Sequence, residues 1–101
     1  MGLELYGDRW KHLGRFSSAG GLDDLGRALQ KHPRRWPEFN EFMRTGMAMV
    51  TKSFLDEVRD FIQGHTTKSG RRCVSLLVKN IASDLLETLE RSKTKRIRIG
   101  I

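Results

Sequence analysis

The sequence contains one cysteine, Cys73, so no disulfide bond can form within the chain. No apolar run approaches the ~18–20 residues that a membrane helix needs. The opening residues, Met-Gly-Leu-Glu-Leu-Tyr, lack the charged and apolar regions of a signal peptide. These absences lead us to expect a soluble chain that is made in the cytosol and has no membrane partner.

Patterns of catalytic and metal-binding residues are missing too. The three histidines lie far apart, without an i, i+4 pair or partner cysteines, so we expect no metal site. Cys73 and a histidine would make a nucleophile and its base, but the apolar neighbours Val74 and Leu77 favour a small buried thiol. The segment that ends in Lys68-Ser69 lacks the second glycine of a phosphate-binding loop. We therefore predict no enzyme activity and no cofactor.

Positive charge is what the chain has in excess. Lys and Arg number 19 against 12 Asp and Glu, which gives a net charge of +7. This balance favours polyanions or acidic protein surfaces as partners, although a soluble protein with surface lysines has it as well. With 101 residues, 38% of them hydrophobic, the chain can build one modest core, and we expect a single domain over residues 1–101.

Three segments have the spacing of amphipathic helices. Leu22–Lys31 is predicted to be a short helix that Pro33 ends. Pro37–Gln63 carries a continuous apolar stripe and is predicted to be one long helix, in which Gly46 marks a bend or a close approach. Arg71–Ser92 is predicted to be a second long helix, and its wide apolar face indicates burial against more than one neighbour.

Both ends of the chain alternate as strands do. Leu3–Tyr6 has this period near the start, and Arg96–Ile101 has isoleucine at every second position. Between them and the helices, Trp10, Leu13 and Phe16 are spaced by three, which permits a helical turn or an amphipathic loop. Because an isolated strand is unstable in water, Arg96–Ile101 should pair either with Leu3–Tyr6 or with a strand edge in a neighbouring molecule.

The predicted fold is therefore mostly α, in the α+β class, with two long antiparallel helices, one short helix and short terminal strands. Residues 1–21 and 93–101 are expected to be flexible or to depend on a partner. The core should lie where the two long helices pack, at positions that share one stripe on each helix. These positions are Val58, Ile62, Val74, Leu77, Ile81 and Leu85.

Three basic segments are candidate contact sites for a partner or for nucleic acid. Their residues are Arg34, Arg35 and Trp36; Lys68, Arg71 and Arg72; and Lys93, Lys95, Arg96, Ile97, Arg98 and Ile99. The first suits phosphate contact and base stacking, although a helix connection with Trp36 turned inward would look the same. The second is a loop at a helix start, which either binds an anion or is merely solvated. The third is the tail, which has no acid after Glu90.

Several short motifs resemble those of the small head–tail joining and tail-completion proteins of tailed bacteriophages. The motifs are Gly21-Leu22-Asp23-Asp24-Leu25, the long helix through Val58 and Ile62, Thr67-Lys68-Ser69-Gly70-Arg71-Arg72, and Ile97-Arg98-Ile99-Gly100-Ile101. The chain departs from the family after Gly70, where it has the pattern of a helix instead of strands. The resemblance implies a non-enzymatic ring or neck component that works by repeated subunit contact, in the host cytoplasm during assembly and then in the virion.

Two functions remain. The first is a structural or assembly protein of the phage type, which acts through protein partners in a homo-oligomer or a virion. It rests on the missing catalytic residues and on a terminal strand with no obvious partner inside a helical chain. The alternative is a small basic accessory protein that binds nucleic acid. Basic clusters on one face beside Trp36 would favour nucleic acid, whereas scattered clusters and an exposed apolar strand would favour assembly.

Overall fold

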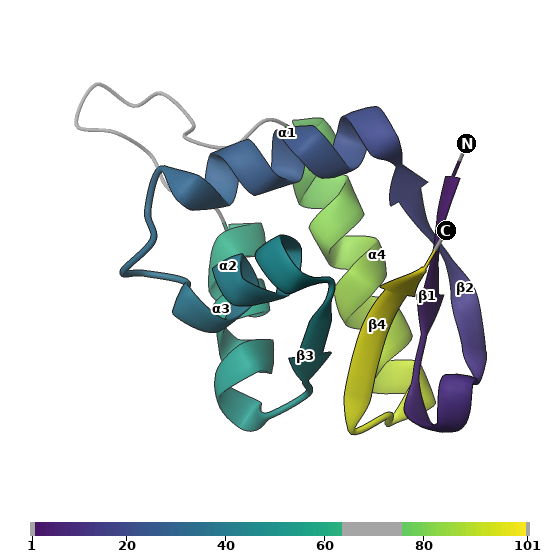
Figure 1. The fold of residues 1–101 in the computed structure, drawn as a ribbon. Coiled ribbons are helices and arrows are strands. Elements are labelled where there is room, and N and C mark those ends of the chain that lie inside the picture. Colours follow the sequence, from purple (N-terminus) through teal and green to yellow (C-terminus); the bar gives the residue numbers. More distant parts are fainter. Residues whose placement is uncertain (1, 64–75, 101) are drawn as a thin grey trace.

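The fold places four helices beside a four-stranded antiparallel sheet, in a computed structural model that describes residues 2–63 and 76–100 (Figure 1). The elements in chain order are β1 (Gly2–Tyr6), the 3-10 turn η1 (Asp8–Trp10), β2 (His12–Ser18), α1 (Ala19–Gln30), α2 (Pro37–Thr45), β3 (Met47–Met49), α3 (Lys52–Gln63), α4 (Leu76–Ser92) and β4 (Arg96–Gly100). The mixed α+β class, with more helix than strand, is confirmed.

The sheet joins the two ends of the chain. Its strands lie in the order β2-β1-β4-β3, so β4 is an interior strand with a neighbour on each side (Figure 1). Leu5 of β1 lies opposite Ile99, and Ala48 of β3 lies opposite Ile97. Of the two pairings that were open for the tail, the structure shows the one with the N-terminal strand of its own chain. The terminal strand therefore does have partners within the chain, β1 and β3, although none was obvious from the sequence.

The expected long helix over residues 37–63 is also wrong, because α2 ends at Thr45 and α3 begins only at Lys52. Gly46 has a φ of 78°, in the left-handed region that glycine adopts most easily. Its N–H donates to the carbonyl oxygen of Phe42 at 2.7 Å, which closes α2 with an ordinary glycine C-cap. The architecture is therefore not a pair of long antiparallel helices.

The residues between α2 and α3 belong to the sheet. The N–H of Ile99 donates to the carbonyl oxygen of Gly46 at 2.7 Å, and the N–H of Val50 donates to that of Lys95 at 2.8 Å. These bonds hold β3 against β4. The hydroxyl oxygen of Thr51 then accepts the N–H of Phe54 at 3.0 Å, which caps the start of α3.

Aromatic side chains fill the core between the helices. Trp36, Phe39, Phe42, Phe54 and Phe61 have no exposed surface. Their rings meet edge to face, with centroids 5.1 Å apart for Trp36–Phe61 and 5.7 Å apart for Phe42–Phe54. These rings, most of them from α2 and α3, tie the two helices together even though the chain between the helices runs through the sheet.

The predicted core positions are partly confirmed. Val58 and Leu85 are buried, and Ile62 and Ile81 are half-buried against the same core. Val74 and the side chain of Leu77 lie outside the described part of the chain. Where the outcome can be assessed, the apolar stripes on α3 and α4 thus mark the sides that face the core.

Candidate binding surface

The sheet has one face toward the core and one toward solvent, because successive side chains along a strand point to opposite sides. Leu5 and Ile97 point inward and are each 2% exposed. Tyr6, Arg98 and Met47 lie opposite one another on β1, β4 and β3 and point to the other side. We call this side the outward face. Its side chains are Glu4, Tyr6, Arg9, Trp10, His12, Arg15, Met47, Met49, Arg96 and Arg98.

Trp10 is the most exposed large apolar side chain of the described residues, at 61%. The guanidinium carbon of Arg98 lies over its ring, 4.0 Å from the ring centroid, which is cation–π geometry. The ring of Tyr6 meets it edge to face at 5.9 Å. The indole is therefore held in place by two strands of the sheet while most of its surface remains in contact with water.

The turn that carries Trp10 has an uncommon backbone. Arg9 and Trp10 have φ values of 56° and 60°, in the left-handed region that residues other than glycine rarely adopt. Each such residue costs on the order of 1–3 kcal/mol and persists only where its surroundings hold it. The η1 turn therefore presents Trp10 on the outward face at a cost in conformational free energy.

Asp8 supplies part of the force that holds this turn. Its carboxylate oxygens accept the backbone N–H groups of Lys95 at 2.9 Å and of Arg96 at 3.1 Å. Its own N–H donates to the hydroxyl oxygen of the buried Thr94 at 2.9 Å. The pKa of Asp8 is lowered, mainly because the Lys95 N–H stabilises the carboxylate. The η1 turn is thus tied to the start of β4.

The outward face has a surplus of positive charge. Arg9, Arg15, Arg96 and Arg98 form no ion pair with any carboxylate of the described residues. The acids nearby are already engaged. Glu4 contacts His12 Nε2 at 2.7 Å, Asp8 binds backbone amides, and Glu41 at the border of the face pairs with Arg44 on α2. An anionic partner at the outward face would therefore meet four arginines without an ion-pair partner among the described residues, whereas the carboxylates of Glu4, Asp8 and Glu41 already have partners.

Apolar surface accompanies this charge. Met47 and Met49 on β3 are 50% and 53% exposed, and with Trp10 they are the large apolar side chains that stand out from the described surface. A shallow groove runs between η1 and β3 and is lined by all three, together with Arg9, Arg96 and Arg98. The outward face therefore offers a mixture of aromatic, thioether and guanidinium groups.

The free edge of β3 is not a good place to add another strand. Since Gly46 and Val50 bond to β4, the N–H and C=O groups of Met47 and Met49 point away from the sheet. The Thr45 hydroxyl contacts both Met47 backbone groups, at 3.0 and 3.3 Å, and the Met49 carbonyl oxygen accepts the Thr51 N–H at 3.0 Å. A three-residue edge closed in this way is protected against strand addition.

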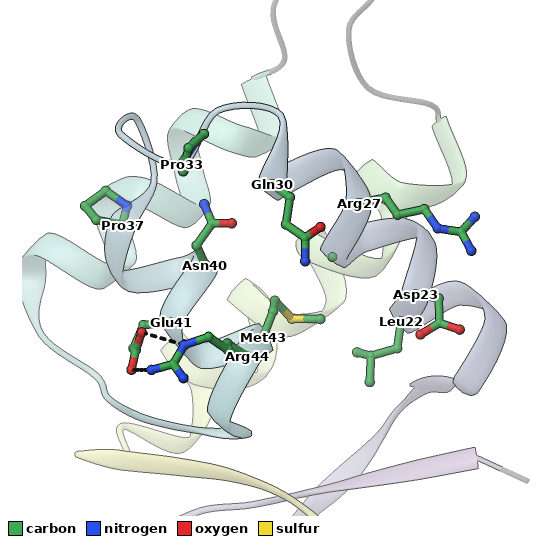
Figure 2. A pocket seen from close by; sticks show the side chains of 11 residues that line it. Leu22, Asp23, Arg27, Gln30, Pro33, Pro37, Asn40, Glu41, Met43 and Arg44 are labelled. Carbon is green, nitrogen blue, oxygen red and sulfur yellow. Dashed lines mark hydrogen bonds and ion pairs between the residues drawn. The ribbon is translucent and has the colours of Figure 1, made fainter.

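A second groove lies between α1 and α2, and Figure 2 shows the side chains that line it. Its polar groups are largely used within the fold. The Asn40 side-chain amide donates to the Trp36 carbonyl oxygen at 2.8 Å, and Glu41 and Arg44 pair with each other (Figure 2). No aromatic ring lines this groove. The outward face is therefore the stronger candidate for a binding site.

The structure separates the basic segments of the described residues. They do not gather on one face beside Trp36, which would have favoured nucleic acid, and the apolar side of the terminal strand is not exposed, which would have favoured assembly. In the tail, Arg96 and Arg98 lie on the outward face, and Lys93 and Lys95 are exposed in the segment before β4. These two arginines are the sequence-predicted contact residues that the outward face contains. Lys68, Arg71 and Arg72 lie outside the described residues.

Ile97 and Ile99 are not surface contacts. Ile97 is buried, and Ile99 is half-buried and packs against the core, because β4 turns its isoleucines inward. The segment between α1 and α2 lies away from the sheet (Figure 1). Arg34 and Arg35 belong to this segment and are exposed. Arg35 contacts Asp60 at 2.9 Å.

The hypothesis that Trp36 stacks on a base of a nucleic acid is wrong for this fold. Its side chain has no exposed surface, and its indole N–H donates to Asp60 Oδ2 at 2.9 Å. The alternative interpretation, a helix connection with Trp36 turned inward, is the one that holds.

Three residues of the outward face, Trp10, Met47 and Met49, were not identified as contact residues from the sequence. The spacing of Trp10, Leu13 and Phe16 is typical of a helical turn, and it hid the β1–β2 hairpin that exposes Trp10.

No family model, no curated protein and no solved structure matches this chain. Within residues 2–63 and 76–100, no group of three or more His, Cys, Asp or Glu side chains is placed to hold a metal ion. In the same ranges, no helix is both long and apolar enough to cross a membrane. An account of function therefore has to be built on the outward face.

Proposed function

We propose that the chain is a non-enzymatic binding protein whose outward face holds nucleic acid. The observation that carries this proposal is the position of the exposed Trp10 in one groove with Arg9, Arg96 and Arg98, which have no carboxylate partner among the described residues. Guanidinium groups bind phosphates, and an aromatic ring offers a surface on which a base can stack. A bare sheet face with this combination is a common platform for nucleic acids.

The net positive charge of the chain also favours nucleic acid as the partner. The net charge of +7 raises the rate of association with any polyanion. At physiological salt, exposed charges act on one another only within a Debye length of about 8 Å, because dissolved ions screen them at longer range. Arg9, Arg96 and Arg98 line one groove and can therefore act together, whereas Arg34 and Arg35 lie in another part of the fold and act separately. The outward face is the site where several phosphates of one strand would be contacted at once.

The test is fluorescence anisotropy with labelled DNA at salt concentrations from about 50 to 200 mM. The double variant Arg15→Gln/Arg96→Gln should weaken binding. It should also reduce the slope of log K against log salt, by about 1.4 for a single strand or about 1.8 for a duplex, because two fewer counterions are released. The matched control is Lys52→Gln/Arg91→Gln, which removes two exposed charges on α3 and α4. Absence of DNA binding at the lowest salt, or an equal loss in the control, would contradict the proposal.

A second candidate function is assembly through protein contacts, in the manner that the phage resemblance implies. It is favoured by Met47 and Met49, which are exposed beside Trp10. Trp, Met and Arg are the residue types enriched in protein interfaces. On this account, the outward face would be covered by a neighbouring subunit in a ring or a virion.

Homo-oligomer formation can be measured with the chain alone. The molecular mass in solution should rise with concentration, and Met47→Lys/Met49→Lys should keep the chain monomeric because it places charge in an apolar contact. Ser53→Lys/Gln63→Lys adds the same charge at exposed positions of α3 and should leave assembly unchanged. A monomer at every concentration would argue against self-assembly through this face.

A further inference from the structure

The proposed function requires only that the outward face attract phosphates, and the geometry of Trp10 goes further. We infer that this face selects single-stranded over double-stranded nucleic acid, with one unpaired base stacked on the indole of Trp10. The inference rests on the proposed function, since it names the form of nucleic acid that the same face would bind.

The exposure of Trp10 favours a single strand. Arg98 already lies over the ring at 4.0 Å, and the residue still has 61% of its surface in water. A base can therefore extend the existing stack without displacing a protein group. In a duplex the faces of the bases are covered by their neighbours, so a stacking ring would have to unstack a base step first. A single strand offers its base faces directly.

The indole ring of Trp10 is also held in place before a ligand arrives. Arg9 and Trp10 adopt strained left-handed conformations, and Asp8 fixes their turn to the backbone of β4. Arg98 and Tyr6 contact the indole from two strands of the sheet. A pre-positioned side chain loses little conformational freedom on binding, so more of the stacking energy appears as affinity.

Positive charge surrounds the indole ring of Trp10. Arg98 stacks on Trp10, so its role is to hold the indole as well as to attract an anion. Arg9 and Arg96 line the same groove beside Trp10 and have no carboxylate partner in the described chain. They are placed to contact phosphates on the strand that carries the stacked base. Met47 and Met49 line the other side of the groove and give apolar contact to sugar or base.

Intrinsic fluorescence tests the inference directly. The chain has two tryptophans, and Trp36 is fully buried, so quenching by an added ligand reports on Trp10. The probes are an oligothymidine of about twelve nucleotides, within the ~4–16 that such surfaces cover, and a duplex of the same length. We expect oligothymidine to quench the emission and to bind more tightly than the duplex.

Trp10→Ala should weaken oligothymidine binding roughly tenfold, within the range measured for loss of one stacked base, and should leave duplex binding unchanged. The salt slope should stay the same, because stacking releases no counterions. Arg96→Gln is the complementary variant, and it should lower the salt slope by about 0.7. Trp10→Phe keeps an aromatic ring and should retain part of the affinity. Since Trp10 is exposed, these variants should fold, and circular dichroism checks this.

The outcomes separate the two proposals. Equal affinity for duplex and oligothymidine, with no effect of Trp10→Ala, would overturn the stacking inference and leave the proposed function standing. No binding of either probe at about 50 mM salt would overturn both. If oligoglutamate of about the same length competed as effectively as unlabelled oligothymidine, the outward face would bind by charge alone. This result too would overturn the inference.

Discussion

The guanidinium of Arg98, on the last strand, lies over the indole of Trp10, in the turn after the first strand, with 4.0 Å between the guanidinium carbon and the ring centroid. The contact brings together two residues from opposite ends of the chain. It is possible only because β4 inserts between β1 and β3, which places the cationic side of the tail next to the η1 turn. The strongest candidate site is therefore a product of the sheet topology.

We expect this contact to stabilise the fold slightly. A double-mutant cycle of Arg98→Ala and Trp10→Ala should give a coupling free energy of about 0.5–1 kcal/mol, the size of an exposed cation–π contact. Urea unfolding of the four proteins measures it. The same cycle with Arg96→Ala in place of Arg98→Ala should give a coupling near zero, and equal coupling in both cycles would mean that the stacking is not specific.

Asp8 should make the stability of the fold sensitive to acid. Its folded-state pKa lies below the usual 3.8 because backbone N–H groups bind the carboxylate. Its contribution to stability is therefore complete above about pH 3.8 and is lost as the pH falls through the lowered pKa. Asp8→Asn should be less stable than the wild type at neutral pH, and the difference should shrink on acidification. Urea midpoints across the acid range measure this, with Asp84→Asn on α4 as the charge control. A difference that is constant with pH would contradict it.

We expect that Gly46 is needed because of its left-handed backbone conformation, and not because a larger side chain would clash there. A Cβ added there would lie 4.0 Å from the nearest side-chain atom, Ile99 Cβ, so no clash is expected. The φ of 78° is unfavourable for alanine, and Gly46→Ala should lower the free energy of unfolding by about 1 kcal/mol. Gly26, inside α1 with open space around it, is the matched position. Gly26→Ala should instead raise stability by about 0.5–1 kcal/mol, and thermal melts should show the opposite signs.

Glu57 should act as the N-cap of α2 from a distant position in the sequence. Trp36, which precedes the helix, provides no side-chain cap, and Glu57 Oε1 accepts the N–H groups of Glu38 at 2.9 Å and Phe39 at 3.1 Å. Glu57→Ala should cost about 1 kcal/mol, as other cap losses do. Glu87→Ala, at an exposed site on α4, is the control. Equal melting temperatures for the two variants would rule out the capping role.

Secondary structure is predicted best from the sequence where the spacing of the apolar residues matches the side of the element that is buried. The alternating isoleucines of Arg96–Ile101 correctly indicated a strand. The need of a strand for a partner left two pairings open, and the structure shows the one with the N-terminal strand. The stripe over residues 37–63 failed because the apolar spacing continues through a three-residue strand. What breaks the helix is Gly46 together with backbone bonds to β4, and those bonds depend on residues about 50 positions away.

The candidate site was harder to foresee for the same reason. Arg96 and Arg98 were identified from charge, but their aromatic partner was expected at Trp36, which lies next to basic residues in the sequence. Trp36 is drawn into the core by Phe61 and by the bond to Asp60. Trp10 joins the arginines only through the order of the strands, and local sequence carries no signal of that order.

A two-dimensional NMR titration of the chain with oligothymidine, followed through the two indole N–H signals, tests directly whether Trp10 and the arginines of β4 form one binding site. We predict that the Trp10 signal shifts together with the side-chain signals of Arg96 and Arg98. The Trp36 signal, held by Asp60 inside the core, should stay in place. Shifts confined to Arg34 and Arg35, or no shift of Trp10 at saturating oligothymidine, would contradict the account.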